Sequence, residues 1–160
     1  MDSSITVIGL IIVLICAVPF VVMYFNNRKK ENEMMQSLHA MASNNKSKIT
    51  AHEFCGDFVL GIDETKKFVY FHKQNKDFSN SSFVNLSQTK ECHITKKQDE
   101  DVSKSSIYAM QSVSLSFRKV NDVHHETHFE LFNRQLNHQL SGELQFADQW
   151  SKRINNLLNK

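Results

Sequence analysis

The sequence predicts an N-terminal transmembrane α-helix followed by an α+β domain, in which a curved antiparallel β-sheet or partly open barrel is capped by a C-terminal α-helix. Three observations support this class: an uncharged apolar run near the N-terminus, period-two alternation in the middle of the chain, and a helical period at its end. The 160 residues suffice for one domain and an anchor. We expect residues 1–30 to form the anchor, 31–50 a helical neck and linker, and 51–160 the domain.

The apolar run extends from Ile5 to Phe25 and contains no charged residue. Its length matches the roughly 20 residues that a helix needs to cross a bilayer. A cleaved signal peptide would begin with a basic segment, whereas here the only charge before the run is Asp2. A lipoprotein signal would place a small residue before its cysteine, but Ile15 precedes Cys16. We therefore interpret the run as an uncleaved membrane anchor.

Basic residues directly after the run predict its orientation. Arg28, Lys29 and Lys30 follow the apolar segment, and cations that flank a span stay on the cytoplasmic side. The chain is thus expected to cross a cell inner membrane once, with its N-terminus outside and its domain in the cytoplasm. Tyr24 would lie at the same interface. The three cations would either contact anionic lipid headgroups or remain solvated, and both interpretations stay open.

The segment after the anchor is polar but carries one apolar stripe. Met34, Met35, Leu38 and Met41 have the spacing of one helix face, so the span is expected to continue as a helix to about Met41. Residues 44–48 would then form a short linker. The stripe would either associate with another chain or, as we favour, contact the chain's own domain or the headgroups. It is too short to predict a coiled coil.

Several stretches of the domain have the alternation typical of β-strands. The first is a hairpin within residues 54–73, with a turn at residues 63–66. Before the turn, the even positions include Phe54, Phe58, Leu60 and Ile62. After the turn, the apolar run continues at Phe68, Tyr70 and His72. Residues 75–80 are expected to form a polar loop. Further strands are predicted at residues 83–86, 91–97, 107–117 and 125–132.

The stretch from Ile107 to Phe117 has the clearest alternation. Its odd positions carry Ile107, Ala109, Val113, Leu115 and Phe117, and Ser112, Ser114 and Ser116 occupy even positions. This pattern predicts a strand with one buried face and one face in water.

The C-terminal stretch changes to a helical period. Ser141 is placed to cap a helix. The apolar residues that follow are three or four apart: Leu144, Ala147, Trp150, Ile154, Leu157 and Leu158. We expect Leu144, Trp150 and Ile154 to plug one open end of the curved sheet, with Trp150 as the main packing residue.

The order of these elements resembles a bacterial pleckstrin-homology-like (PH-like) domain over about residues 52–159. The resemblance ends in the stretch Gly142-Glu143-Leu144-Gln145-Phe146-Ala147-Asp148-Gln149-Trp150-Ser151-Lys152-Arg153-Ile154. In that fold a C-terminal helix closes a partly open antiparallel barrel and seats an apolar residue in its mouth. The Lys- and Asn-rich composition with an N-terminal anchor is also similar to membrane proteins of Bacteroidota. The resemblance implies membrane-proximal binding or assembly and not catalysis.

The histidines at residues 124–128 come closest to a catalytic motif. A zinc protease needs His-Glu-x-x-His on a helix. His124 and His128 have that spacing, but Glu126 is displaced, and the alternation around them predicts a strand. Residues four apart on a strand lie about 13 Å from each other, too far to share a metal ion. We expect an exposed polar strand face here, and no metal site.

Other chemistries find little support in the sequence. Cys92 and His93 are adjacent, which on a strand directs them to opposite faces, and Cys55 and Cys92 match no disulfide or zinc spacing. We expect both to be free thiols. No Gly-x-Ser-x-Gly elbow occurs, and four glycines are too few for a phosphate-binding loop, so no cofactor is expected. A net charge of +2 argues against nucleic-acid binding.

These observations favour a membrane-anchored, non-enzymatic binding or scaffold protein that holds a protein partner or a lipid headgroup near the inner membrane. An exposed sheet edge would be the natural docking surface, by strand addition. The alternative is an accessory subunit that packs into a larger membrane complex through its span. A metal-dependent hydrolase that uses His124 and His128 is a distant third.

Overall fold

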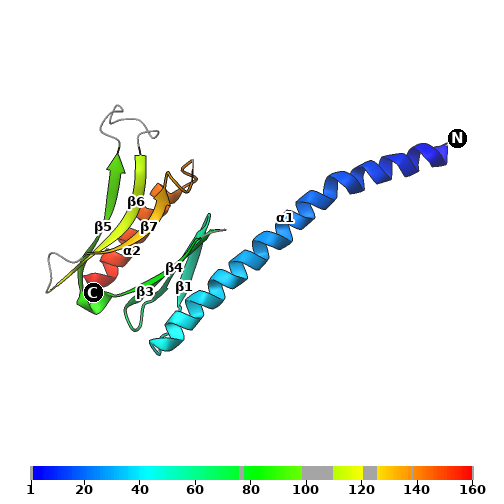
Figure 1. Cartoon of the computed structure of the whole chain (residues 1–160). Helices are drawn as coiled ribbons and strands as arrows, with labels where there is room; N and C mark the ends of the chain where they lie inside the picture. The colour runs from blue at the N-terminus through cyan, green and yellow to red at the C-terminus, as the bar shows by residue number, and fades with distance from the viewer. Residues whose placement is uncertain (1, 76–77, 99–109, 121–125, 138, 160) are drawn as a thin grey trace.

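The structure, a computed structural model, describes residues 2–75, 78–98, 110–120, 126–137 and 139–159. These residues form a long N-terminal helix, two groups of strands and a C-terminal helix (Figure 1). In chain order the elements are α1 (Asp2–Asn44), β1 (Ala51–Cys55), β2 (Phe58–Asp63), β3 (Phe68–Asn75), β4 (Phe78–Asn85), the short 3-10 helix η1 (Leu86–Gln88), β5 (Thr89–Gln98), β6 (Met110–Lys119), β7 (Glu126–Asn133) and α2 (Glu143–Leu158).

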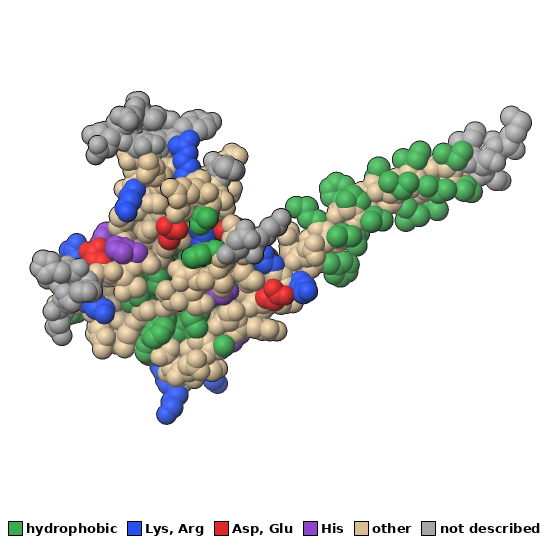
Figure 2. Space-filling model, in the orientation of Figure 1, with side chains coloured by type: hydrophobic (Ala, Val, Ile, Leu, Met, Phe, Trp, Pro, Cys, Tyr) green, Lys and Arg blue, Asp and Glu red, His purple; other side chains and the backbone are tan. Residues whose placement is uncertain are grey.

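Helix α1 contains both the predicted anchor and the predicted neck without a break. Its N-terminal part is long and apolar enough to span a membrane, and none of that part is buried against the rest of the chain. Figure 2 shows it projecting from the domain with hydrophobic side chains along the projecting length. Pro19 lies within the helix, as a membrane span tolerates. The helix ends at Asn44, close to the predicted end at about Met41.

The strands form two antiparallel sheets, a four-stranded one in the order β1-β2-β3-β4 and a three-stranded one in the order β5-β6-β7. One hydrophobic core fills the space between the two sheets and α2. Phe71 of the first sheet and Phe129 of the second stack there, with ring centroids 5.1 Å apart. The predicted α+β class, with antiparallel strands followed by a C-terminal helix, is confirmed.

The alternation predicted for β6 is confirmed on its core side. Val113, Leu115 and Phe117 are buried in the core. The prediction that the opposite face is exposed to solvent is wrong at Ser116, which is fully buried. Side chains of the neighbouring strands cover it, and its hydroxyl lies 2.6 Å from Thr95 Oγ1 and 2.7 Å from His128 Nδ1. Residues 107–109, which we also assigned to this strand, lie outside the described part of the chain.

Both faces of the first sheet are covered, which corrects the side predicted for Phe54. Phe58, Leu60 and Ile62 face the core as predicted, but Phe54 packs on the other side, opposite Val59. The reason is the turn between β1 and β2, which interrupts the parity that the prediction carried across it. On β3 the core-facing residues are Val69 and Phe71, whereas Phe68 and Tyr70 face outward.

Two further local predictions are wrong. Residues 75–80 are not a loop throughout, since β4 begins at Phe78, which pairs with Asn75. Pairing with β3 overrides the low strand propensity of serine and asparagine in this segment. Ser141 is not the N-cap of α2. Gly142 takes that position with φ 117°, and the backbone amide of Ser141 donates a hydrogen bond to the Glu143 carboxylate.

The second half of α1 packs on the outer face of the first sheet, as the favoured interpretation of its apolar stripe predicts. Met34, Leu38 and Ala42 are buried together with Val59 of β2 and Tyr70 of β3. Residues four apart lie on one side of a helix, so a single face of α1 makes this contact. The domain boundaries that we assigned around residue 50 stay a prediction.

Gly61 and Asp63 on β2 fix the position of α1. A Cβ atom at Gly61 would lie 2.5 Å from Leu38 Cδ2, so any larger residue would force the Leu38 side chain or the helix to shift. Farther along β2, the Asp63 carboxylate accepts hydrogen bonds from Ser47 Oγ at 2.6 Å and from the Lys48 amide at 2.9 Å. Leu38 thus lies over Gly61, whereas the residues that follow the helix contact Asp63. The C-terminal part of α1 therefore runs in the same direction as β2.

Candidate functional site

The residues predicted at the membrane interface follow one another along α1. Tyr24 and Arg28 lie one helical turn apart and interact directly, with Arg28 Nε 3.2 Å from the Tyr24 hydroxyl and the guanidinium 5.4 Å from the ring centroid. Lys29 is exposed and Lys30 is half-buried. Met34, the first residue of α1 buried against the sheet, follows Lys30 by about one turn. The basic segment thus lies directly between the apolar part of the helix and the domain.

The residues predicted to plug the sheet all lie at the core. Trp150 and Ile154 are buried, and Leu144 packs partly buried against the same cluster. The Trp150 indole stacks on Phe146 with centroids 5.8 Å apart, and its Nε1 donates to Glu53 Oε2 at 2.8 Å. The side chain therefore has both an apolar contact and a hydrogen-bond partner on β1.

The histidine cluster lies partly on a strand, as its alternation predicts. His128 is an exposed residue of β7, and His124 lies outside the described residues. His128 Nδ1 is close to Ser116 Oγ, which resembles a nucleophile and its base, but that serine is 0% exposed and no substrate could reach it. Among the described residues, no three His, Cys, Asp or Glu side chains lie close enough together to hold a metal ion.

The two described cysteines of the domain are free thiols, as predicted. Burial raises the pKa of Cys92 to about 12 and the pKa of Cys55 to about 11. A thiol with so high a pKa is almost fully protonated at neutral pH, and the thiolate is the nucleophilic form. Neither side chain is therefore prepared for nucleophilic chemistry.

The described strands at the edges of the two sheets are β1, β4, β5 and β7. On β5 and β7, backbone groups form hydrogen bonds with side chains of other elements. On β5, Asn155 of α2 accepts from the Cys92 amide at 2.9 Å and donates to the Cys92 carbonyl at 2.6 Å. On β7, the buried amine of Lys73 donates to the carbonyls of Glu130 and Leu131, at 3.4 and 3.1 Å. These contacts also hold the sheets and α2 together, and they hinder another strand from pairing there.

Strand β4 is different, although the carbonyl of its last residue, Asn85, accepts a hydrogen bond from Thr89 Oγ1 at 2.9 Å. It pairs with β3 on one side, and no strand among the described residues pairs with it on the other. Its eight residues, Phe-Ser-Asn-Ser-Ser-Phe-Val-Asn, include no charged side chain and no proline. Proteins usually protect such an edge with charges, prolines, bulges or short strands, because its free amide and carbonyl groups can pair with another chain. The remaining outer strand, β1, has only five residues.

An aromatic row leads from α1 to the open edge of β4. Phe68 and Tyr70 of β3 and Phe83 of β4 have ring centroids about 6 Å apart. Tyr70 is covered by α1, whereas Phe83 is 49% exposed. Beside this row, His72 Nδ1 lies 2.7 Å from Ser81 Oγ, and burial lowers the pKa of His72. The edge therefore presents backbone groups together with an apolar surface.

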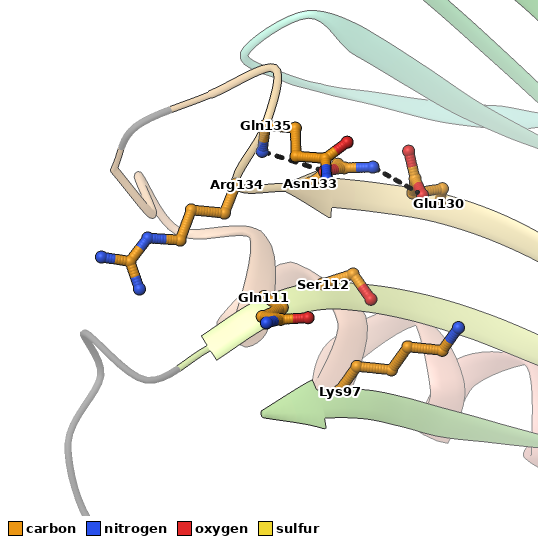
Figure 3. Close-up of a pocket in the computed structure, with 7 residues that line it drawn as sticks. All are labelled: Lys97, Gln111, Ser112, Glu130, Asn133, Arg134 and Gln135. Atoms are coloured by element: carbon orange, nitrogen blue, oxygen red, sulfur yellow. Dashed lines mark hydrogen bonds between the residues drawn. The ribbon is translucent and has the colours of Figure 1, made fainter. Parts of the chain in front are cut away.

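Among the described residues, the polar side chains of one surface hollow do not point toward a common centre. This hollow, shown in Figure 3, has a volume of about 310 Å³ and is lined by polar side chains of β5, β6, β7 and the turn after β7. Its two cations, Lys97 and Arg134, point away from each other, and Asn133 donates to Glu130 at 3.1 Å within the wall. A smaller hollow of about 160 Å³ adjoins the end of β4 and includes Phe83 and Asn85.

Comparisons with known proteins give no relative from which a site could be transferred. No protein-family model, no curated protein and no solved structure matches the chain.

The sequence did not identify β4 as the open edge, although it contains one usable signal. The run of eight residues from Phe78 to Asn85 has no charged side chain, and charged side chains are one of the devices by which proteins protect an edge strand. Because we predicted a loop at residues 75–80, the first three residues of β4 were assigned to that loop, and the uncharged strand was not recognised at its full length.

Proposed function

We propose that the chain is a membrane-anchored, non-enzymatic binding protein that holds a protein partner beside the membrane, with an extended segment of the partner added as a strand to β4. The observation that carries this proposal is the open, uncharged edge of β4 with Phe83 exposed on it. Backbone pairing would supply affinity, and the side chain that the partner places next to Phe83 would supply specificity. The apolar part of α1 would supply the anchor.

The anchor argues for a different protein as the partner, and against a second copy paired through β4. Two copies of β4 that pair antiparallel are related by a twofold axis perpendicular to the sheet. That axis would reverse the direction of α1, which lies along the face of the sheet. The two apolar segments would then point in opposite directions and could not enter one membrane from the same side.

The finer features of the proposal come from the sequence. The basic residues Arg28 to Lys30 support a cytoplasmic position for the domain at an inner membrane. Sheets of four and three antiparallel strands followed by a C-terminal helix with Trp150 in the core are compatible with the proposed PH-like fold. That resemblance supports a binding role in place of catalysis.

Site-specific crosslinking in native membranes tests the proposal. A photoreactive residue replaces Ser79, an exposed side chain of β4, and adducts are isolated and identified. Phe83→Lys is then added, because a lysine on a sheet edge opposes strand addition. Its matched control is Val120→Lys, which introduces the same charge at an equally exposed apolar residue after β6.

We expect one protein adduct that disappears with Phe83→Lys and persists with Val120→Lys. An adduct that persists with Phe83→Lys would refute docking at this edge. An adduct between two copies of the chain would refute the choice of partner. If a complex is lost only when the apolar segment of α1 is exchanged for another span, the chain is instead an accessory subunit held by its helix.

A further inference from the structure

The docking of α1 determines how far each end of the first sheet lies from the apolar part of the helix. Leu38 packs on Gly61, which is level with Phe83 in the sheet register. Phe78 lies five residues farther toward the N-terminal end of α1, about 17 Å at 3.4 Å per residue. Arg28 precedes Leu38 by ten residues, about 15 Å along the helix. Phe78 is therefore level with Arg28, at the basic end of the apolar segment.

A second exposed apolar residue lies at the same end of the domain. Leu136 follows β7 and precedes Asn137, whose side-chain amide donates to Asp57 Oδ2 at 3.3 Å. Asp57 lies in the turn before β2, four residues from Gly61 in the direction of Phe78. Outside α1, the described large hydrophobic residues that are exposed are Phe78, Phe83, Val120 and Leu136. Two of these four are thus on the end that faces the membrane if α1 spans it.

We infer that this end of the domain rests on the bilayer, with Phe78 and Leu136 in contact with lipid at the level of Arg28. The inference rests on the anchoring role proposed above. Single exposed apolar residues are common on soluble domains, but apolar and aromatic side chains at the level of headgroups gain by partitioning into the interface. Because α1 is packed on the sheet, the domain cannot turn these side chains away from the bilayer without losing the contacts of Leu38.

Tryptophan fluorescence with bromine-labelled phospholipid tests this contact. The full chain is reconstituted in vesicles of phosphatidylcholine and phosphatidylglycerol, with a quencher lipid brominated near the headgroup. Phe78→Trp and Leu136→Trp are compared with Val120→Trp, because the exposed fractions are 44%, 42% and 55% and each change places a tryptophan on the surface of the domain. Val120 lies at the far end of the domain, where its amide donates to the Gln88 carbonyl. The native Trp150 is 2% exposed and serves as an unquenched background.

We expect quencher lipid to reduce the emission of Phe78→Trp and Leu136→Trp and to leave that of Val120→Trp at the level of the unsubstituted chain. Equal quenching of all three variants, or of none, would overturn the inference. Flotation with the vesicles is measured first on the same samples. A chain that does not float refutes the anchor itself, whereas a chain that floats without selective quenching refutes only the bilayer contact, and partner docking at β4 is tested separately.

Discussion

Replacement of Gly61 by alanine tests whether α1 is packed firmly on the sheet. The added methyl group would lie 2.5 Å from Leu38 Cδ2 and 3.2 Å from Ile49 Cγ2. Carbon atoms in contact prefer about 3.5–4.0 Å, so the helix or the leucine must move by about 1 Å. Leu38 is fully buried, so a change of its rotamer would disturb the neighbours that pack around it. We expect a loss of about 1–3 kcal/mol in the free energy of unfolding, the usual cost of overpacking.

A double-mutant cycle with Leu38→Ala separates this clash from other effects of the substitution. Leu38→Ala alone should cost about 2–5 kcal/mol, because it leaves a cavity between α1 and β2. It also removes Cδ2, so Gly61→Ala should cost little in that background, a coupling of about 1–3 kcal/mol. The measurement is guanidinium unfolding of the full chain in detergent micelles, followed by Trp150 fluorescence. Equal costs of Gly61→Ala in both backgrounds would refute the docking of α1 on Gly61.

Three further predictions concern buried polar groups. Lys73→Ala removes both hydrogen bonds to β7 carbonyls and the ion pair with Asp57, and should lower the free energy of unfolding by about 1–3 kcal/mol in the same assay. Cys92 should resist alkylation at pH 8 until the chain unfolds, because burial raises the pKa of its thiol to about 12. Burial alone would raise the pKa of Asp63, but hydrogen bonds from Ser47 and three backbone amides outweigh it and hold the pKa below the ordinary value of an aspartate. The resulting stabilisation of the folded state is complete above the ordinary pKa and is lost as the pH falls through the lowered pKa, a dependence that Asp63→Asn should remove.

Each of these predictions has a control within the chain. Lys152→Ala removes an exposed ion pair with Asp148 and should leave the unfolding midpoint unchanged, so an equal effect of both lysine variants would contradict the role of Lys73. Alkylation is measured with Cys16 and Cys55 replaced by alanine, and rapid labelling of the folded chain would contradict burial of Cys92. If the stability of Asp63→Asn still falls at acid pH as it does in the unsubstituted chain, other carboxyl groups are responsible for the pH dependence.

Periodicity predicted the elements whose environment is simple. The apolar segment of α1 meets one kind of surroundings along its whole length, and α2 has one buried and one exposed side, so a single pattern describes each. Val113, Leu115 and Phe117 of β6 likewise alternate with polar neighbours. These patterns are local properties of the sequence, so they can be recognised without knowing which helix or strand packs against the segment.

Features that depend on contacts between distant segments could not be predicted. Phe54 and Tyr70 look like residues of the central core, and only the docking of α1 shows that the sheet has a second buried face. Gly61 looks like an ordinary weak point in a strand until Leu38 is placed above it. The open edge of β4 is likewise a property of the sheet order, since a strand becomes an edge only through the absence of a neighbour.

The two proposals together restrict the geometry of the partner. If Phe78 touches the bilayer, β4 begins at the headgroups and extends about 27 Å away from them over its eight residues. An antiparallel strand added to β4 would then run toward the bilayer and reach it opposite Phe78. The partner would be a protein that itself enters the membrane or lies on it, with the paired segment directly before that point. Crosslinkers at Ser79 and Phe83 should therefore attach to the partner in a fixed order along its sequence, with the Phe83 adduct before the Ser79 adduct. The reverse order would indicate parallel addition, and a partner without any membrane contact would contradict this combined arrangement.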